Sequence, residues 1–170
     1  MQPIYSVQLH LPEDKLPGYY AQIVKGIADT VTLLDRDKTL LFVRTQADAD
    51  AIEAFVAKYK VDCEHGQWVQ LDESWAIQMR SFTDYGLITR SDNRFLDLSL
   101  ASIVSLSPGP SPESAELDQA IEQADEHALA WRNQNDGRRL LAVDRHQTEL
   151  IAGIAKAYRC ASGVVLAAAD

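Results

Sequence analysis

The stretch "VDCEHGQW", residues 61–68, sets side by side four side chains of the kinds that bind metals or take part in catalysis: Asp62, Cys63, Glu64 and His65. On an extended strand, Cys63 and His65 would lie on the same face, where a thiolate and an imidazole could share a metal ion or form a nucleophile and its base. A catalytic pair of Cys63 and His65 is therefore one interpretation. The simpler one is a small buried thiol where a helix ends and a strand begins.

Zinc sites built on local sequence bring a second pair of Cys or His ligands from elsewhere in the chain. Here the other residues of these two types are scattered singly: His10, His127, His146 and Cys160. One short cluster without a partner motif rarely makes a site, so we expect no metal at Cys63 and His65.

The stretch "VDRHQ", residues 143–147, stands between an expected strand and an expected helix. In open α/β sheets, ligands bind beyond the carboxyl ends of parallel strands, and helix amides there can hold an anion. Arg145 and His146 could bind such a ligand, with Asp144 and His146 as catalytic groups. The simpler interpretation is a helix cap at Asp144 with Gln147 completing a capping box. A cap and a pocket can coexist, and the sequence leaves both open.

A long amphipathic helix is expected at residues 111–134, after the turn-rich segment "SPGPSPES". Its apolar residues recur four, three, four and three positions apart: Leu117, Ile121, Ala124, Ala128 and Trp131. The helix is strongly acidic, and we predict that Glu122, Asp125 and Glu126 contact a partner protein. The interpretation as a solvated face remains open beside it.

Net charge narrows the class of partner. The chain of 170 residues has 25 acidic and 16 basic side chains, a formal charge of −9. This field repels nucleic acids and anionic membranes and favours a basic protein partner. Neither a secretory signal nor an apolar run long enough for a membrane span is visible, and two cysteines suit reduced thiols, so we expect a cytoplasmic protein. Walker, dinucleotide-binding and hydrolase motifs are also missing, which predicts no cofactor and leans against an enzyme.

The order of expected elements predicts an α+β fold. Residues 1–72 read as strand, helix, strand, strand, helix, strand, the order of a ferredoxin-like βαββαβ unit. A strand-rich middle follows, then the long helix and a C-terminal βαβ whose two strands would be parallel neighbours. The domains would be 1–72 and 73–170, or one single domain 1–170. No internal repeat is visible.

These features favour a non-catalytic cytoplasmic binding or regulatory protein, of adaptor, inhibitor or immunity type, that uses an acidic surface. The alternative is a small α/β enzyme or ligand sensor with an anion-binding pocket at Asp144, Arg145 and His146.

Overall fold

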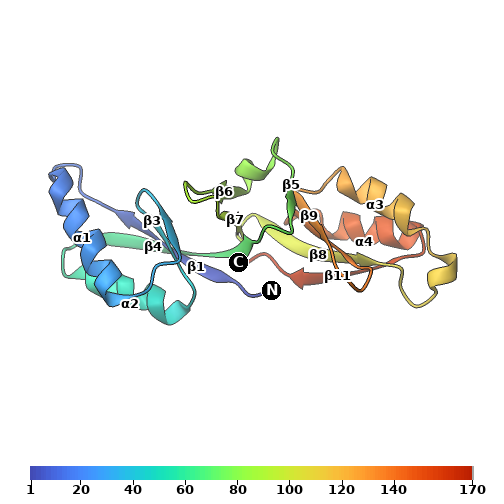
Figure 1. Ribbon diagram of the computed structural model, residues 1–170, viewed down its shortest axis with the longest axis horizontal. Helices are drawn as coiled ribbons and strands as arrows, with labels where there is room; N and C mark the ends of the chain where they lie inside the picture. Colours follow the sequence, from blue (N-terminus) through green and yellow to red (C-terminus); the bar gives the residue numbers. More distant parts are fainter. Residues whose placement is uncertain (170) are drawn as a thin grey trace.

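The computed structural model describes residues 1–169. The molecule is elongated, and each half of its length contains one antiparallel sheet (Figure 1). The first sheet has the order β2-β3-β1-β4-β7-β6, with bounds Asp35–Asp37, Leu40–Val43, Ile4–His10, Asp62–Leu71, Arg94–Asp97 and Gly86–Ile88. The second has the order β11-β8-β10-β9-β5, with bounds Ala161–Leu166, Ala101–Ser107, Arg139–Asp144, Ala130–Asn133 and Ala76–Ile77. The expected α+β class is confirmed.

Helices α1 (Pro17–Thr30) and α2 (Gln46–Ala57) pack on one face of the first sheet. Proline at the start of α1 suits a first helical turn, and the Thr45 side chain caps α2 by accepting the Asp48 amide. Under the helices lies a core of aliphatic side chains: Val7, Leu9, Ile23, Ile27, Ile52 and Val56. Alternation along β1 sends Val7 and Leu9 toward this core.

Helices α3 (Leu117–Asp125) and α4 (Thr148–Ala157) pack in the same way on the second sheet. Its central strand, β10, is apolar on both faces. Leu141 and Val143 lie under the helices, while Leu140 and Ala142 point to the opposite side. Short alanines on α3, Ala120 and Ala124, let the helix approach this sheet closely. Burial on both faces explains the unbroken apolar run of β10.

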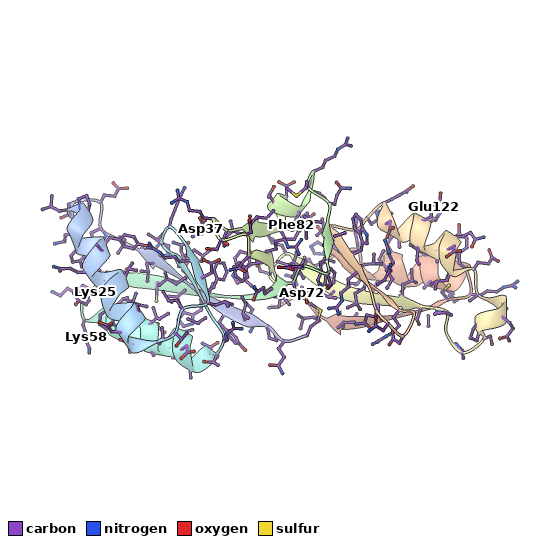
Figure 2. The ribbon with its side chains drawn as sticks, viewed as in Figure 1. Lys25, Asp37, Lys58, Asp72, Phe82 and Glu122 are labelled. Atoms are coloured by element: carbon purple, nitrogen blue, oxygen red, sulfur yellow. The ribbon has the colours of Figure 1, made fainter. Side chains whose placement is uncertain are left out.

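One hydrophobic core joins the two sheets. It combines residues of the first sheet, of the second, and of the segment between β4 and β6: Val69, Leu71, Leu96, Ile103, Leu140, Trp75 and Phe82. Figure 2 shows Phe82 at this junction. The segment 73–98 serves both sheets, because β5 pairs with β9 while β6 and β7 extend the first sheet beyond β4. The two halves therefore bury apolar area against each other.

The second half repeats the order of the first. The elements β8-α3-β9-β10-α4-β11 follow one another as β1-α1-β2-β3-α2-β4 do, and the strand order β11-β8-β10-β9 matches β4-β1-β3-β2. The second helix of each half, α2 in the first and α4 in the second, ends with the same turn. Lys60 and Arg159 have positive φ angles of 58° and 60°, and the next amide bonds back to Val56 or Ala155. The sequence shows no repeat, and the structure reveals one in the order of elements and in the turns that end α2 and α4.

The expected helix at 111–134 is wrong over most of its length. A short 3₁₀ turn occupies Pro112–Ser114, α3 spans only Leu117–Asp125, and Trp131 lies on β9. The segment "NQNDG" is the hairpin turn between β9 and β10, with Gly137 at φ 87°. Pairing of β9 with the buried β10 overrides the helical periodicity, because an apolar spacing of three and four does not exclude a short strand.

The C-terminal strand-helix-strand order is present, but the predicted pairing is wrong. Strands β10 and β11 are not neighbours, because β8 lies between them and pairs antiparallel with both. The strand-rich middle is confirmed in β6, β7 and β8, although β5 has only two residues. Among the described residues, none of the helices has the length and apolar character that crossing a membrane requires.

Candidate functional sites

Cys63 and His65 lie two residues apart on β4, as expected of an extended stretch, and a third group joins them from α2. Glu53 Oε2 is 3.0 Å from His65 Nε2. Ligand atoms of Glu53, Cys63 and His65 all lie within 4.8 Å of one another, and we call these three residues the ligand cluster. Glu53 was missed from the sequence because only the packing of α2 against β4 brings it to the strand.

The environment of Cys63 does not suit a nucleophile. Burial raises the pKa of its thiol, and the negative charges of Glu53 and Asp62 raise it further. A nucleophilic cysteine needs the opposite, a neighbouring positive charge that favours the thiolate. His65 is held on both sides, since Gln46 Nε2 lies 3.3 Å from its Nδ1 and Glu53 from its Nε2. The arrangement is therefore better suited to receiving a cation than to attacking an electrophile.

Asp144, Arg145 and His146 lie at the end of β10, but not as the predicted cap. Helix α4 begins at Thr148, so the capping box is wrong. Asp144 instead accepts bonds from Tyr85 Oη (2.6 Å) and the His146 amide (2.7 Å). These bonds, Tyr85 first, lower the pKa of the Asp144 carboxyl below its ordinary value and, from the other side, raise the pKa of Tyr85. This contact ties the β6 region to β10.

Arg145 contacts backbone carbonyls through one guanidinium nitrogen. Its Nη1 donates to the carbonyls of Ser99 (2.9 Å) and Ala169 (3.4 Å), which fastens the C-terminal segment to the turn before β8. His146 is exposed. The three residues are adjacent, but the parallel strands on which the pocket argument rested are not neighbours.

The three acids predicted to bind a partner have different environments. Glu122 and Glu126 are exposed, and Figure 2 shows Glu122 pointing outward from α3. Asp125 turns inward and holds the guanidinium of Arg139, with contacts of 2.6 and 3.1 Å. Because Arg139 is 8% exposed, Asp125 serves as the counter-charge of a buried guanidinium. Sequence periodicity could not distinguish Asp125 from the other acids of α3. Its partner Arg139 lies on β10, which is separated from α3 in the chain by β9.

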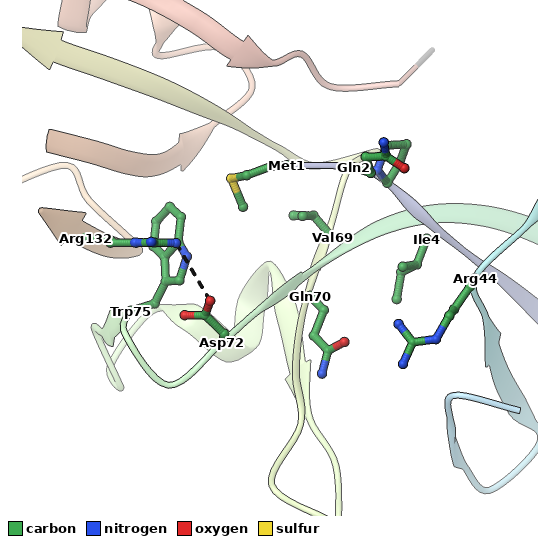
Figure 3. A pocket seen from close by; sticks show the side chains of 10 residues that line it. Met1, Gln2, Ile4, Arg44, Val69, Gln70, Asp72, Trp75 and Arg132 are labelled. Atoms are coloured by element: carbon green, nitrogen blue, oxygen red, sulfur yellow. Dashed lines mark ion pairs between the residues drawn. The ribbon is translucent and has the colours of Figure 1, made fainter. Parts of the chain in front are cut away.

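A cleft between the two halves was not predicted. Its cavity of about 480 Å³ has Ile4, Val69 and Trp75 on its walls and two guanidinium groups, those of Arg44 and Arg132. Figure 3 shows these arginines on opposite sides, with Val69 and Gln70 between them. Arg132 is 3.7 Å from the Asp72 carboxylate, while Arg44 forms no ion pair with any described residue. These residues come from distant parts of the chain, so no local motif announces the cleft.

A second cavity of about 560 Å³ adjoins the central cleft and shares Gln70, Asp72 and Arg132 with it. Arg94 and Asp92 also line this second cavity. The hydrogen bond from Ser74, and then the charges of Arg132 and Arg94, lower the pKa of Asp72, despite some burial. Asp72 lines both cavities, and its lowered pKa keeps the carboxylate ionised at neutral pH.

Three comparisons with known proteins do not add to these observations. No protein-family model matches the chain, and neither the curated proteins nor the solved structures contain a match to it. The geometry of the chain itself therefore carries the functional argument.

Proposed function

We propose that this protein is a non-catalytic binding protein that recognises a basic partner protein. The observation that carries the proposal is an acidic face on and beside α3, formed by exposed carboxylates: Glu113, Glu116, Asp118, Glu122 and Glu126. None of the five pairs with a cation among the described residues. No lysine or arginine occurs between Arg94 and Arg132, so the charge of this segment is not neutralised locally.

The packing of α3 supports this role. Leu117, Ala120 and Ala124 point to the core under the helix, so the carboxylates are left on the outer side. Such a field speeds the encounter with a basic protein and repels nucleic acid. We accordingly propose an adaptor, inhibitor or immunity-type regulator that acts in the cytoplasm. The strand order β2-β3-β1-β4 and the two helices on one face support our assignment of residues 1–72 as a ferredoxin-like unit.

The acidic face predicts a salt-sensitive complex. Native mass spectrometry of untagged protein purified gently from its own host would identify a bound polypeptide, which is then titrated by calorimetry. Reversing two charges, Glu122→Lys with Glu126→Lys, should weaken this complex by about tenfold or more and leave the melting temperature nearly unchanged. The matched control reverses Glu13 and Asp14, exposed acids in the other half, and should bind normally. Equal affinity for both double variants would contradict the proposal.

The central cleft supports a second candidate, a ligand-binding protein. A mixed polar and apolar lining between two guanidinium groups suits a small molecule with a carboxylate or phosphate at either end. The earlier alternative, an anion pocket at Asp144, Arg145 and His146, stays a prediction, although the engagement of Arg145 with two carbonyls favours the cleft.

A thermal-shift titration with phosphorylated and carboxylated metabolites tests the cleft. A true ligand at a hundredfold excess over its dissociation constant stabilises the protein by about 2.7 kcal/mol. Arg44→Ala should abolish this stabilisation, whereas Arg80→Ala, at an exposed position outside the cavity, should preserve it. A shift that survives Arg44→Ala would exclude Arg44 as the anchor.

A further inference from the structure

The ligand cluster combines the donor types that bind zinc. We propose that Glu53, Cys63 and His65 form a binding site for a divalent cation of borderline softness, of which Zn²⁺ is the type. Thiolate, imidazole and carboxylate are the three protein ligands that zinc takes, and three of them with one open position form the pattern of a site that keeps a water or binds a further group. Calcium and magnesium are unsuited, because they require mostly oxygen ligands.

The spacing of the donors requires little movement. In a tetrahedral zinc site, neighbouring ligand atoms lie about 3.3 to 3.6 Å apart, given bonds of about 2.0 to 2.3 Å. Glu53 and His65 are already 3.0 Å apart, and the thiol lies within 4.8 Å. A rotation of the Glu53 side chain toward the thiol would shorten the remaining gap. Glu53 is the side chain with room to move, since it is exposed, whereas Cys63 packs against the core.

The backbone around the cluster is fixed by buried neighbours. Cys63 is paired with Leu9 and His65 with Val7, both core residues of β1. On α2, Ile52 and Val56 are fully buried on either side of Glu53 along the chain. Strand and helix thus hold the three side chains against each other, as a rigid site requires.

Two groups around the cluster tune it. Gln46 lies between Asp50 Oδ1 (2.9 Å) and His65 Nδ1 (3.3 Å), the position of a second ligand shell. On binding, the thiol releases its proton to solvent as the metal–sulfur bond forms. With a cation on Nε2, His65 would carry its ring proton on Nδ1, and the Gln46 amide would turn to accept it. The nearby carboxylate of Asp62, which raises the pKa of the thiol without a cation, adds to the negative potential that attracts one.

The repeated half provides an internal comparison. Val56 and Ala155 occupy equivalent positions, as do Lys60 and Arg159, each pair 99 residues apart. The same spacing makes Ala152, Ser162 and Val164 the equivalents of the ligand cluster, and these three also lie together, around one cavity. The fold therefore forms this corner without any metal-binding side chain. The packing of this corner therefore does not require the side chains of Glu53, Cys63 and His65.

Cobalt titration of the reduced, untagged protein tests the site. We expect one equivalent of Co²⁺ to bind and to give the near-ultraviolet charge-transfer band of a cobalt–thiolate bond. Zn²⁺ should displace it and raise the melting temperature. Cys63→Ser should abolish the band, and Cys160→Ser, which removes the other free thiol, should retain it. Glu53→Gln and His65→Gln should each weaken binding by about tenfold or more.

Opposite results would overturn the proposal. The first such result is the absence of the charge-transfer band at micromolar protein and a tenfold excess of Co²⁺. The second is a band that is lost with Cys160→Ser but kept with Cys63→Ser. Circular dichroism of each metal-free variant verifies that it folds. The metal site and the acidic face share no residues. The variant Glu122→Lys with Glu126→Lys should therefore bind Co²⁺ like the unaltered chain. Failure of either proposal therefore leaves the other standing.

Discussion

Replacing Asp125 by alanine is expected to lower the free energy of unfolding by about 3 kcal/mol, because it leaves a buried guanidinium without its counter-charge. Arg139 is 8% exposed and contacts both carboxylate oxygens of Asp125, at 2.6 and 3.1 Å. Asn133 accepts a further bond of 2.9 Å, but it is neutral and cannot replace the charge. The value lies at the lower end of the usual range, since the Asp125 side chain is 32% exposed and water can partly compensate.

Urea denaturation followed by circular dichroism measures this loss. The matched control is Glu122→Ala on the same helix, which should change stability by less than about 0.5 kcal/mol because that side chain is exposed. A second variant, Asp125→Ala with Arg139→Met, should recover part of the loss, since it removes the unpaired charge as well. If Asp125→Ala were as harmless as Glu122→Ala, the pair of Asp125 and Arg139 would not stabilise the fold.

Phe95→Ala is expected to cost about 3 to 5 kcal/mol of unfolding free energy, the range for deleting a buried aromatic ring. Phe95 is fully buried and stacks on Phe42, with ring centroids 4.1 Å apart and planes at 14°. Trp68 meets the same Phe42 ring edge-on at 5.2 Å. Loss of the ring would therefore leave a cavity on the face of the first sheet opposite α1 and α2.

The size of this effect is checked against an exposed apolar residue. Leu16→Ala, at a side chain that is 81% exposed, should change stability by less than about 0.5 kcal/mol. Both variants are measured by urea denaturation, with the slope of the transition compared as well as its midpoint. A cost below about 1 kcal/mol for Phe95→Ala would mean that this face of the sheet is loosely packed.

The sequence predicts the first half of the fold better than the second. Alternation in β1 and helical spacing in α1 and α2 are strong local signals, and they led to the observed order of elements. In the second half, Trp131 continues a helical stripe in the sequence but lies on β9, because pairing with β10 is a contact between segments that local spacing does not encode. The position of β8 between β10 and β11 likewise depends on contacts between segments that are distant in the sequence.

The candidate sites divide in the same way. That Cys63 and His65 share a face follows from the period of a strand, so it could be predicted. Glu53 could not, because its approach depends on how α2 crosses the sheet. The inward turn of Asp125 and the facing arginines of the central cleft also depend on packing between distant segments. The sequence therefore identifies candidate groups, and the fold decides which of them meet.

The hydrophobic core shared by the two sheets has a thermodynamic consequence. Val69 and Leu71 on β4 are covered by residues of the second sheet, so neither half can open without exposing apolar surface of the other. We expect the chain to unfold as one cooperative unit. A partner on α3 or a cation on β4 that binds only the native state would then stabilise the entire chain. Through this cooperativity, occupancy at one end of the molecule would protect the opposite end from unfolding and proteolysis.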